Sequence, residues 1–273
     1  MATRIVYTDL DGTMVGPHGS FWTTAGGAPT SVPADALLEL HRAGVPLVLV
    51  SGRTATQLME TARVFAADGA IAELGSLVTW DGGLRSELLT GDLPERYAGR
   101  EPVHVLDELG VVEQLMAAHP GRLEWHAPWH ATHSADAMLR GNVDTASVDA
   151  WLAGRGWDWL TLNDNGAVPV TPVMTLAAEG LPPHVYHLMP RGISKGEAIR
   201  WDLTRRGLTA ADAVAVGDSV SDLEMAAAVG RLFITANGAA VPGMAERIAA
   251  LDNVTVTDAP MGEGWAQAVM ASL

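Results

Sequence analysis

The sequence contains no cysteine. This absence excludes disulfide bonds, a thiol nucleophile, and zinc or iron–sulfur sites with thiolate ligands. Basic residues are also scarce: 17 Lys and Arg stand against 32 Asp and Glu, and the formal net charge is −15. Nucleic acids and anionic membranes are bound through clusters of Lys and Arg. We therefore expect neither a nucleic acid nor a membrane as a partner.

Long apolar runs are missing as well. The apolar residues before Asp9 are too few for the core of a signal peptide. The uncharged segment 14–34 is rich in Gly, Pro, Ser and Thr, which is typical of a loop and not of a membrane span. A functional lid and an unstructured insertion are equally open interpretations of this loop, in which Phe21 and Trp22 are the bulky apolar pair. The expected location is cytoplasmic, and the sequence leaves the oligomeric state open.

The composition supports a folded protein with a large core. Of its 273 residues, 48% are hydrophobic and 18% are charged, and this length favours two domains. Short apolar runs alternate with helical patterns at both ends of the chain. We expect strands at 5–9, 45–50, 70–73, 213–216 and 232–234, and helices at 33–43, 54–65, 195–207, 221–229 and 244–250. This alternation predicts an α/β fold with a doubly wound, Rossmann-like parallel sheet.

The middle of the chain follows a different pattern. Between residues 84 and 188, Trp and His become frequent, and Gly82-Gly83 and Leu181-Pro182-Pro183 mark possible boundaries. Strand-like segments occur at 122–126, 159–162, 174–178 and 185–188, and helical segments at 111–119 and 144–155. We therefore expect a discontinuous core domain, 1–83 and 189–273, with an α+β domain inserted at 84–188.

Four polar motifs lie at the predicted ends of strands or starts of helices. They are Asp9-Leu10-Asp11-Gly12-Thr13, Ser51-Gly52-Arg53, Lys195-Gly196, and Gly217-Asp218-Ser219-Val220-Ser221-Asp222. Open α/β sheets place their sites at such positions. The hydroxyl of Ser51 and the ammonium of Lys195 suit phosphoryl oxygens, and the carboxylates of Asp9 and Asp218 are hard oxygen ligands suited to Mg²⁺. Crowded carboxylates repel one another, so a cation explains how they coexist.

Taken together, these motifs resemble those of the haloacid dehalogenase-like (HAD) hydrolases. They read DLDGT, SGR, SKGEAI and GDSVSD, and Thr235–Ala239 is similar to a small-residue loop of this family. The closer resemblance is to the Cof-like, sucrose-phosphatase and mannosyl-phosphoglycerate-phosphatase group (type IIB). In that group a cap domain of the C2 type lies between the second and third motifs. The interval from Ser51 to Lys195 has room for such a cap.

The resemblance implies a role for each matching residue. Asp9 would be the nucleophile, and Asp11 would be the general acid and then the base. A Mg²⁺ ion would be held by Asp9, Asp218 and the main-chain carbonyl of Asp11, with Asp222 as a direct or water-mediated ligand. Phosphate binding would fall to Gly12, Thr13, Ser51, Gly52 and Lys195, and substrate binding to Arg53 and Asn237.

The sequence departs from the family pattern at two places. Ser221 stands where the family usually has Asn, and Leu74-Gly75 stands where many relatives have Asn-Gly. Neither departure removes a core catalytic group.

The inserted segment holds His126, His130 and His133, with Trp125 and Trp129 each directly before a histidine. Three interpretations stay open: a metal site, substrate recognition by His126, Trp129 and His130, and packing of a Trp-rich core.

The leading functional hypothesis is a Mg²⁺-dependent phosphatase. Its substrate would be a small phosphomonoester, in particular a sugar or glycosyl phosphate, and it would act through an aspartyl-phosphate intermediate. Two alternatives are a phosphoryl transferase or phosphomutase, and a non-catalytic protein that binds a phosphorylated ligand on the same fold. The presence of Asp9, Asp11, Lys195 and Asp218 disfavours the last, since a binding protein needs neither a nucleophile nor an acid.

Overall fold

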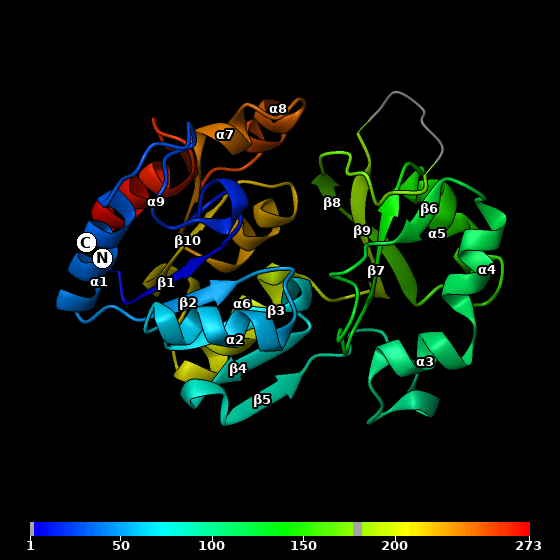
Figure 1. Cartoon of the computed structure of the whole chain (residues 1–273). Helices are drawn as coiled ribbons and strands as arrows, with labels where there is room; N and C mark the ends of the chain where they lie inside the picture. Colours follow the sequence, from blue (N-terminus) through cyan, green and yellow to red (C-terminus); the bar gives the residue numbers. More distant parts are fainter. Residues whose placement is uncertain (1–2, 177–181) are drawn as a thin grey trace. The chain divides into compact units, whose positions relative to one another are not determined.

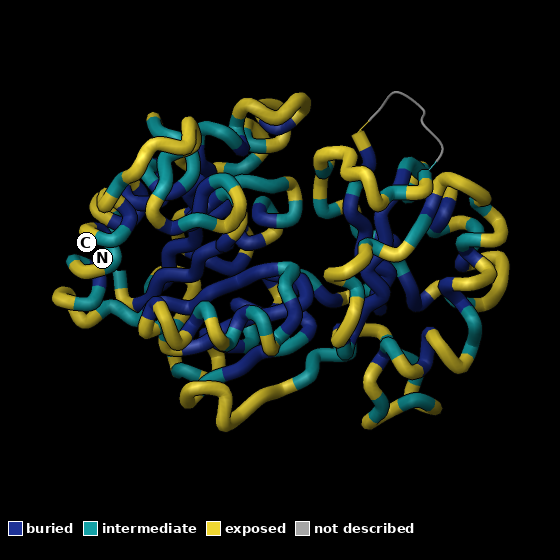
Figure 2. Tube along the Cα trace, in the orientation of Figure 1, coloured by how far each residue is buried: buried dark blue, intermediate teal, exposed yellow. Residues whose placement is uncertain are grey.

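A computed structural model describes residues 3–176 and 182–273 of the chain (Figure 1). Its contacts divide the chain into two compact units. Unit 1 comprises residues 1–87 and 194–273, and unit 2 comprises residues 88–193. The sequence interpretation placed the two boundaries after residues 83 and 188. In each unit the buried residues concentrate along the central strands (Figure 2).

Unit 1 is built on an eight-stranded sheet with the order β12-β11-β10-β1-β2-β3-β4-β5. The strands are β1 (Ile5–Thr8), β2 (Leu47–Val50), β3 (Gly69–Ala72), β4 (Leu77–Trp80), β5 (Arg85–Leu88), β10 (Ala213–Gly217), β11 (Arg231–Ile234) and β12 (Val254–Val256). From β12 to β3 all neighbours are parallel, and β4 runs antiparallel to β3. The expected α/β fold with a mainly parallel sheet is confirmed.

Helices cover both faces of this sheet. The helices of unit 1 are α1 (Val32–Arg42), α2 (Ala55–Val64), α6 (Lys195–Arg206), α7 (Ala236–Ala239), α8 (Met244–Ala249) and α9 (Met261–Met270), with a 3₁₀ segment η6 (Ser221–Ala228). Val6 of β1 packs into one apolar cluster with α1, α2 and α9. The next residue, Tyr7, points to the opposite face and donates a hydrogen bond to Asp202 of α6 at 2.9 Å. Both faces are therefore buried, as a doubly wound sheet requires.

The long loop between β1 and α1 packs against the rest of unit 1. It contains a short 3₁₀ turn, η1 (Pro17–Gly19). Phe21 is buried, and its ring centroid lies 4.6 Å from that of Phe65 at the end of α2. Trp22 stays 60% exposed. Burial of Phe21 does not agree with an unstructured insertion, because a loop without tertiary contacts would leave such a ring in water.

Unit 2 contains a four-stranded antiparallel sheet with the order β6-β7-β9-β8. Its elements are β6 (Leu123–Trp125), β7 (Ala137–Gly141), β8 (Leu160–Ala167), β9 (His184–Pro190), α3 (Pro102–Glu108), α4 (Val111–Ala118) and α5 (Thr145–Ala153). One apolar cluster joins the sheet to these helices and includes Leu115, Leu139 and Val148. Of the strand predicted at 174–178, residues 174–176 are not in a strand, and residues 177–178 lie outside the described residues.

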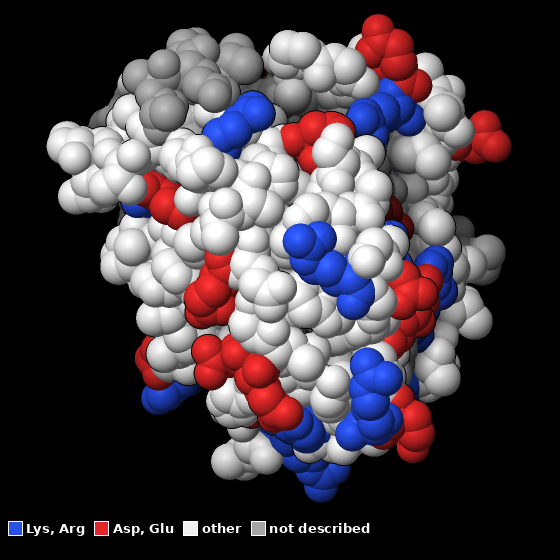
Figure 3. Space-filling view, turned by 90° about the vertical axis from the view of Figure 1, so that its right-hand side faces the viewer, with Lys and Arg blue, Asp and Glu red and all other residues white. Residues whose placement is uncertain are grey.

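The charged side chains on the surface and the lengths of the helices can be compared with what binding to nucleic acids or membranes requires. On the face drawn in Figure 3, Lys and Arg side chains are interspersed with Asp and Glu, so this face carries no continuous basic patch. Within residues 3–176 and 182–273, every helix is too short or too polar to cross a bilayer.

Candidate active site

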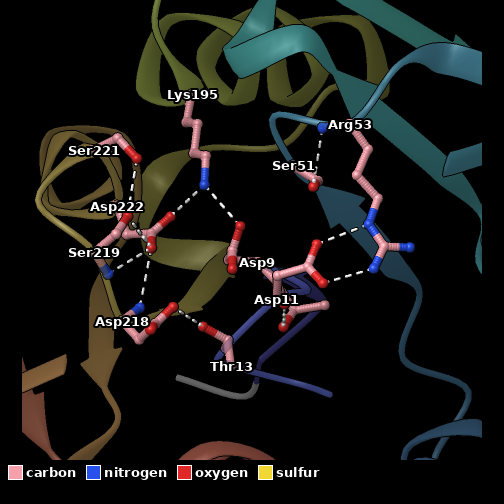
Figure 4. A network of polar contacts seen from close by, with 11 residues as sticks. Asp9, Asp11, Thr13, Ser51, Arg53, Lys195, Asp218, Ser219, Ser221 and Asp222 are labelled. Atoms are coloured by element: carbon pink, nitrogen blue, oxygen red, sulfur yellow. Dashed lines mark hydrogen bonds and ion pairs between the residues drawn. The ribbon is translucent and has the colours of Figure 1, made fainter. Parts of the chain in front are cut away.

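The polar motifs of unit 1 meet at one edge of its sheet (Figure 4). Asp9 follows β1, Ser51 follows β2, and Asp218 follows β10, while β1 lies between β10 and β2 in the parallel part of the sheet. The carboxyl ends of parallel strands lie at the same edge, and β1 is where the chain changes direction across the sheet. The strand order therefore brings Asp218 to Asp9 and Ser51, which lie far from it in the sequence.

Lys195 is the centre of the charge network. It is the first residue of α6, and Ser194 caps that helix by accepting a hydrogen bond from the Glu197 N–H at 3.1 Å. The Lys195 side chain is buried, and its Nζ donates to Asp9 Oδ1 at 2.7 Å and to Asp222 Oδ1 at 2.6 Å. Burial alone would lower the pKa of Lys195, but Asp222 and Asp9 raise it above its usual value. Lys195 is therefore a permanent positive charge beside Asp9.

Three carboxylates crowd around this cation. Asp9, Asp218 and Asp222 each offer an oxygen, and these oxygens lie within 4.8 Å of one another. Burial, with the charges of Asp222 and Asp218, raises the pKa of Asp9 against the effect of Lys195. Burial and the charge of Asp222 raise the pKa of Asp218 to about 7. A second cation would relieve this repulsion, and the hard oxygen donors fit a divalent ion such as Mg²⁺.

Asp222 differs from the other two carboxylates because both of its oxygens are already engaged. Lys195 donates to Oδ1, while Oδ2 accepts from the Asp218 N–H (3.0 Å), the Ser219 N–H (2.9 Å) and the Ser219 hydroxyl (2.7 Å). Burial would raise the pKa of Asp222, but Lys195 and the Ser219 donors hold it below its usual value. Its surroundings suit an anchor for Lys195 better than a direct metal ligand.

Asp218 is oriented by residues that the sequence interpretation had assigned to phosphate and substrate. Thr13 Oγ1 donates to Asp218 Oδ1 at 2.8 Å, and Asn237 Nδ2 donates to Asp218 Oδ2 at 3.1 Å. Asn237 also donates to the Gly12 carbonyl and accepts from the Met261 N–H. The side chains of Thr13 and Asn237 thus support a carboxylate. Gly12 has φ +85°, and a Cβ there would lie 2.4 Å from Asp218 Oδ2, so this position requires glycine.

Asp11 forms a separate pair with Arg53. The guanidinium Nε donates to Asp11 Oδ2 at 2.7 Å and Nη2 donates to Oδ1 at 2.6 Å, a bidentate arrangement. The Asp11 side chain is 52% exposed, whereas Ser51 is buried and its hydroxyl accepts from the Arg53 N–H at 3.2 Å. Arg53, expected to contact substrate, fixes the direction of the Asp11 carboxylate.

One of the two departures from the family pattern, Ser221, has a structural explanation. Ser221 lies 2.9 Å from Ser219, Oγ to Oγ. Because Ser219 gives its hydroxyl proton to Asp222, Ser221 donates to Ser219 and extends the polar chain that holds Asp222. The second departure, Leu74, is buried and has φ +55°, and nothing in the structure explains why Leu stands there. The glycine that follows it, Gly75, has φ +112°, and a Cβ there would lie 2.2 Å from the Ser194 carbonyl, so glycine lets this loop touch the start of α6. Sequence reasoning missed Ser219; its only signal was its place three residues before Asp222.

The residues singled out in unit 2 lie at the end of β6 and on the segment that follows it. Trp129 is 55% exposed, and His126 and His130 are half-buried. Burial, reinforced by Arg140, lowers the pKa of His126 to about 4, so this ring is neutral at pH 7. Among the described residues of unit 2, the group that could hold a metal is not His126, His130 and His133, but His133 with Asp136 and His187.

Comparison with known proteins agrees with this geometry. A family model described as haloacid dehalogenase-like hydrolase matches residues 173–257. A phosphoglycolate phosphatase of Pyrobaculum aerophilum is 26% identical over 276 residues, which cover 98% of this chain and 95% of that protein. The chain is thus similar to haloacid dehalogenase-like hydrolases, in one segment by the family model and over nearly its whole length by this relative. A Halobacterium salinarum phosphoglycolate phosphatase is 37% identical to this chain over 110 residues, or 38% of this chain and 48% of that protein.

Solved structures show the same fold. A Thermoplasma acidophilum protein superposes with a TM-score of 0.67 at 15% identity, covering 100% of this chain and 99% of that chain. The sucrose-phosphatase of Synechocystis sp. PCC6803, solved with sucrose and phosphate, gives a TM-score of 0.64 at 16% identity and covers 100% and 98%. At this identity the likeness concerns the fold alone, and it extends over both units of the chain.

Proposed function

We propose that this hydrolase cleaves small phosphate monoesters with Asp9 as the nucleophile. The observation that carries the proposal is the position of Asp9, which lies at the end of β1, 2.7 Å from a buried lysine and within 4.8 Å of two further carboxylates. A cation beside a carboxylate that faces a polar edge of the sheet suits attack on phosphorus, where negative charge must be held in place. The relatives named phosphoglycolate phosphatase, one of them matched over nearly its whole length, support the same chemistry.

In the proposed reaction, a carboxylate oxygen of Asp9 attacks phosphorus, and the bond from phosphorus to the ester oxygen breaks. Asp11 gives its proton to the leaving alkoxide, so an alcohol departs and an aspartyl-phosphate remains. Asp11, now ionised, then takes a proton from water as that water attacks phosphorus. The bond between Asp9 and phosphorus breaks, and phosphate and free Asp9 result. Lys195 is placed to stabilise the phosphoryl charge in both steps.

We propose that Mg²⁺ is held by Asp9, Asp218 and the main-chain carbonyl of Asp11. When bound, the ion offsets the charge of the phosphoryl oxygens and of the carboxylates around it. Asp222 acts from behind this site: it holds Lys195 and the turn that starts at Asp218. Thr13 and Asn237 keep the Asp218 carboxylate oriented.

We propose that unit 1 is the catalytic core and that unit 2 is the cap of this family. Two classes of substrate are candidates. The motif group favours a sugar or glycosyl phosphate, and a structural neighbour is named as a sucrose-phosphatase. Phosphoglycolate is the second class, because relatives matched over more than nine-tenths of both chains carry that name.

An activity panel tests the proposal. Purified protein with Mg²⁺ would be given phosphoglycolate, hexose phosphates and glycosyl phosphates, and released phosphate would be measured. We expect turnover on at least one class, its loss with chelator, and its loss in Asp9→Asn. The matched control is Asp35→Asn, which makes the same change at an exposed carboxylate of α1. Absence of turnover over the whole panel with folded, Mg²⁺-supplied protein would contradict the proposal, and transfer to a sugar hydroxyl without phosphate release would indicate a transferase.

A further inference from the structure

Unit 2 contains a buried cluster of two histidines and one aspartate that the proposed reaction does not use. His133 Nδ1 lies 2.9 Å from Asp136 Oδ1, and His187 Nδ1 lies 3.0 Å from Asp136 Oδ2. The side chains of all three residues are buried, with Asp136 and His187 fully so. One ligand atom from each residue lies within 4.8 Å of the other two.

The sheet explains why these residues meet. Asp136 comes immediately before β7, and Met138 of β7 pairs with His187 of the antiparallel strand β9. Residues two apart in a strand point to the same face, so Asp136 lies diagonally across from His187 on that face. His133 reaches the same carboxylate from the turn before β7. The cluster therefore joins the segment before β7 to β9.

Charge and hydrogen bonding leave this cluster incomplete as it stands. In the described part of the chain, the ion pairs of Asp136 are with these two histidines and not with a lysine or arginine. The nearby Arg140 is itself paired with Glu124 at 2.5 Å. Within the same described residues, Asp136 Oδ1 is buried and lies close to His133 Nδ1 without the geometry of a hydrogen bond, so this proposed ligand atom is not satisfied. A closed hydrogen-bond network would satisfy the three residues without a metal, but this network is open.

We propose that His133, Asp136 and His187 bind a transition-metal ion of the Zn²⁺ class in unit 2. Two imidazoles and one carboxylate are ligands that suit Zn²⁺ or Co²⁺, whereas Mg²⁺ and Ca²⁺ prefer oxygen alone. With zinc bonds of about 2.0–2.1 Å, tetrahedral ligands lie roughly 3.3 Å apart. The two nitrogen–oxygen distances of 2.9 and 3.0 Å need only a small increase to reach that spacing. The ion is structural: it ties the turn before β7 to β9.

Cobalt is the probe that tests this site. The full chain, stripped with chelator and kept in excess Mg²⁺ to fill the carboxylate site of unit 1, would be titrated with Co²⁺. We expect one equivalent to bind with the visible d–d absorption of a low-coordinate site with nitrogen ligands. The absorption should persist in Asp218→Asn, which removes a carboxylate of the unit 1 cluster, and disappear in His187→Gln.

His184→Gln is the matched control, because His184 lies on the same strand and is paired with Asp164 at 2.7 Å, but it is exposed and outside the cluster. This variant should bind Co²⁺ as the unsubstituted chain does. If His187→Gln fails to fold, X-ray absorption of the Co²⁺-loaded unsubstituted protein decides, since it must show two imidazole ligands. No bound Co²⁺ in the unsubstituted protein, or the same spectrum in His187→Gln, would overturn the proposal.

Discussion

Asp222→Asn separates the role of an anchor from the role of a metal ligand. Asp222 and Lys195 form an ion pair at 2.6 Å, and both side chains are buried. Removing one partner of a buried pair costs about 3–5 kcal/mol. Lys195 keeps Asp9 at 2.7 Å, and the remaining amide oxygen can still accept from the Asp218 and Ser219 N–H groups. The expected loss lies at the low end, about 3 kcal/mol of the free energy of unfolding.

The assay is urea or thermal unfolding of the whole chain in the presence of chelator, so that metal binding does not contribute. For a chain of this length, 1 kcal/mol corresponds to a shift of about 2–4 °C, so Tm should fall by roughly 6–12 °C. Glu197→Gln is the matched control. It removes a carboxylate that is paired with Arg200 on the exposed side of α6, the helix that begins with Lys195. That change should alter stability by less than about 1 kcal/mol.

The two roles predict opposite results. If Asp222 were a direct ligand with no anchoring role, its replacement would weaken Mg²⁺ binding and leave the metal-free protein as stable as before. An Asp222→Asn protein within about 0.5 kcal/mol of the unsubstituted chain in chelator would refute the reasoning from the Lys195 pair.

Three further predictions concern the neighbours of this pair. Thr13→Val removes the hydroxyl that donates to Asp218, so the Kd for Mg²⁺ should rise about tenfold in calorimetry, while Thr13→Ser should bind normally. The pKa of Asp218 is raised to about 7 in the folded, metal-free protein. Between about pH 4 and pH 7 the folded chain therefore holds one proton more than the unfolded chain, and the free energy of unfolding of the metal-free protein should fall as pH rises through that range. Added Mg²⁺ must displace this proton, so it should raise Tm more at pH 8 than at pH 6; an equal effect would contradict the assignment. If Arg53 positions Asp11, Arg53→Met should lower kcat about tenfold with little change in KM. Arg53→Lys should lower kcat as well, because lysine cannot form the bidentate pair. A selective rise in KM would instead indicate that Arg53 contacts the substrate.

The place of the site could be predicted because it depends on strand ends. Asp9 and Asp218 each follow a short apolar run, and parallel strands align such positions at one edge. The carboxylates at these positions indicate that the site binds a cation, and the nearby Ser51 and Lys195 indicate that it binds a phosphoryl group. The division of labour among the carboxylates was not predictable, because Asp222 reaches Lys195 only through the 3₁₀ turn that begins after Asp218.

Two strands and the histidine cluster of unit 2 could not be predicted from the sequence, each for a different reason. The sheet of unit 1 continues into β4 and β5, but β5 (Arg85–Leu88) is an exposed edge strand and lacks the alternation that marks a half-buried strand. In unit 2, β7 (Ala137–Gly141) is buried along its whole length and includes a buried arginine, so its pattern does not alternate either. The cluster of His133, Asp136 and His187 depends on the pairing of β7 with β9, which no short-range spacing reveals.

The direct test of the proposed chemistry is the covalent intermediate. Protein mixed with Mg²⁺ and its best substrate would be quenched in acid within one turnover and analysed by mass spectrometry. Acyl phosphates survive brief acid treatment, so the intact chain should carry one phosphoryl group, and peptide mapping should place it on Asp9. The signal should be absent in Asp9→Asn. Phosphate on another residue, or rapid turnover with inversion of configuration at phosphorus, would contradict Asp9 as the nucleophile.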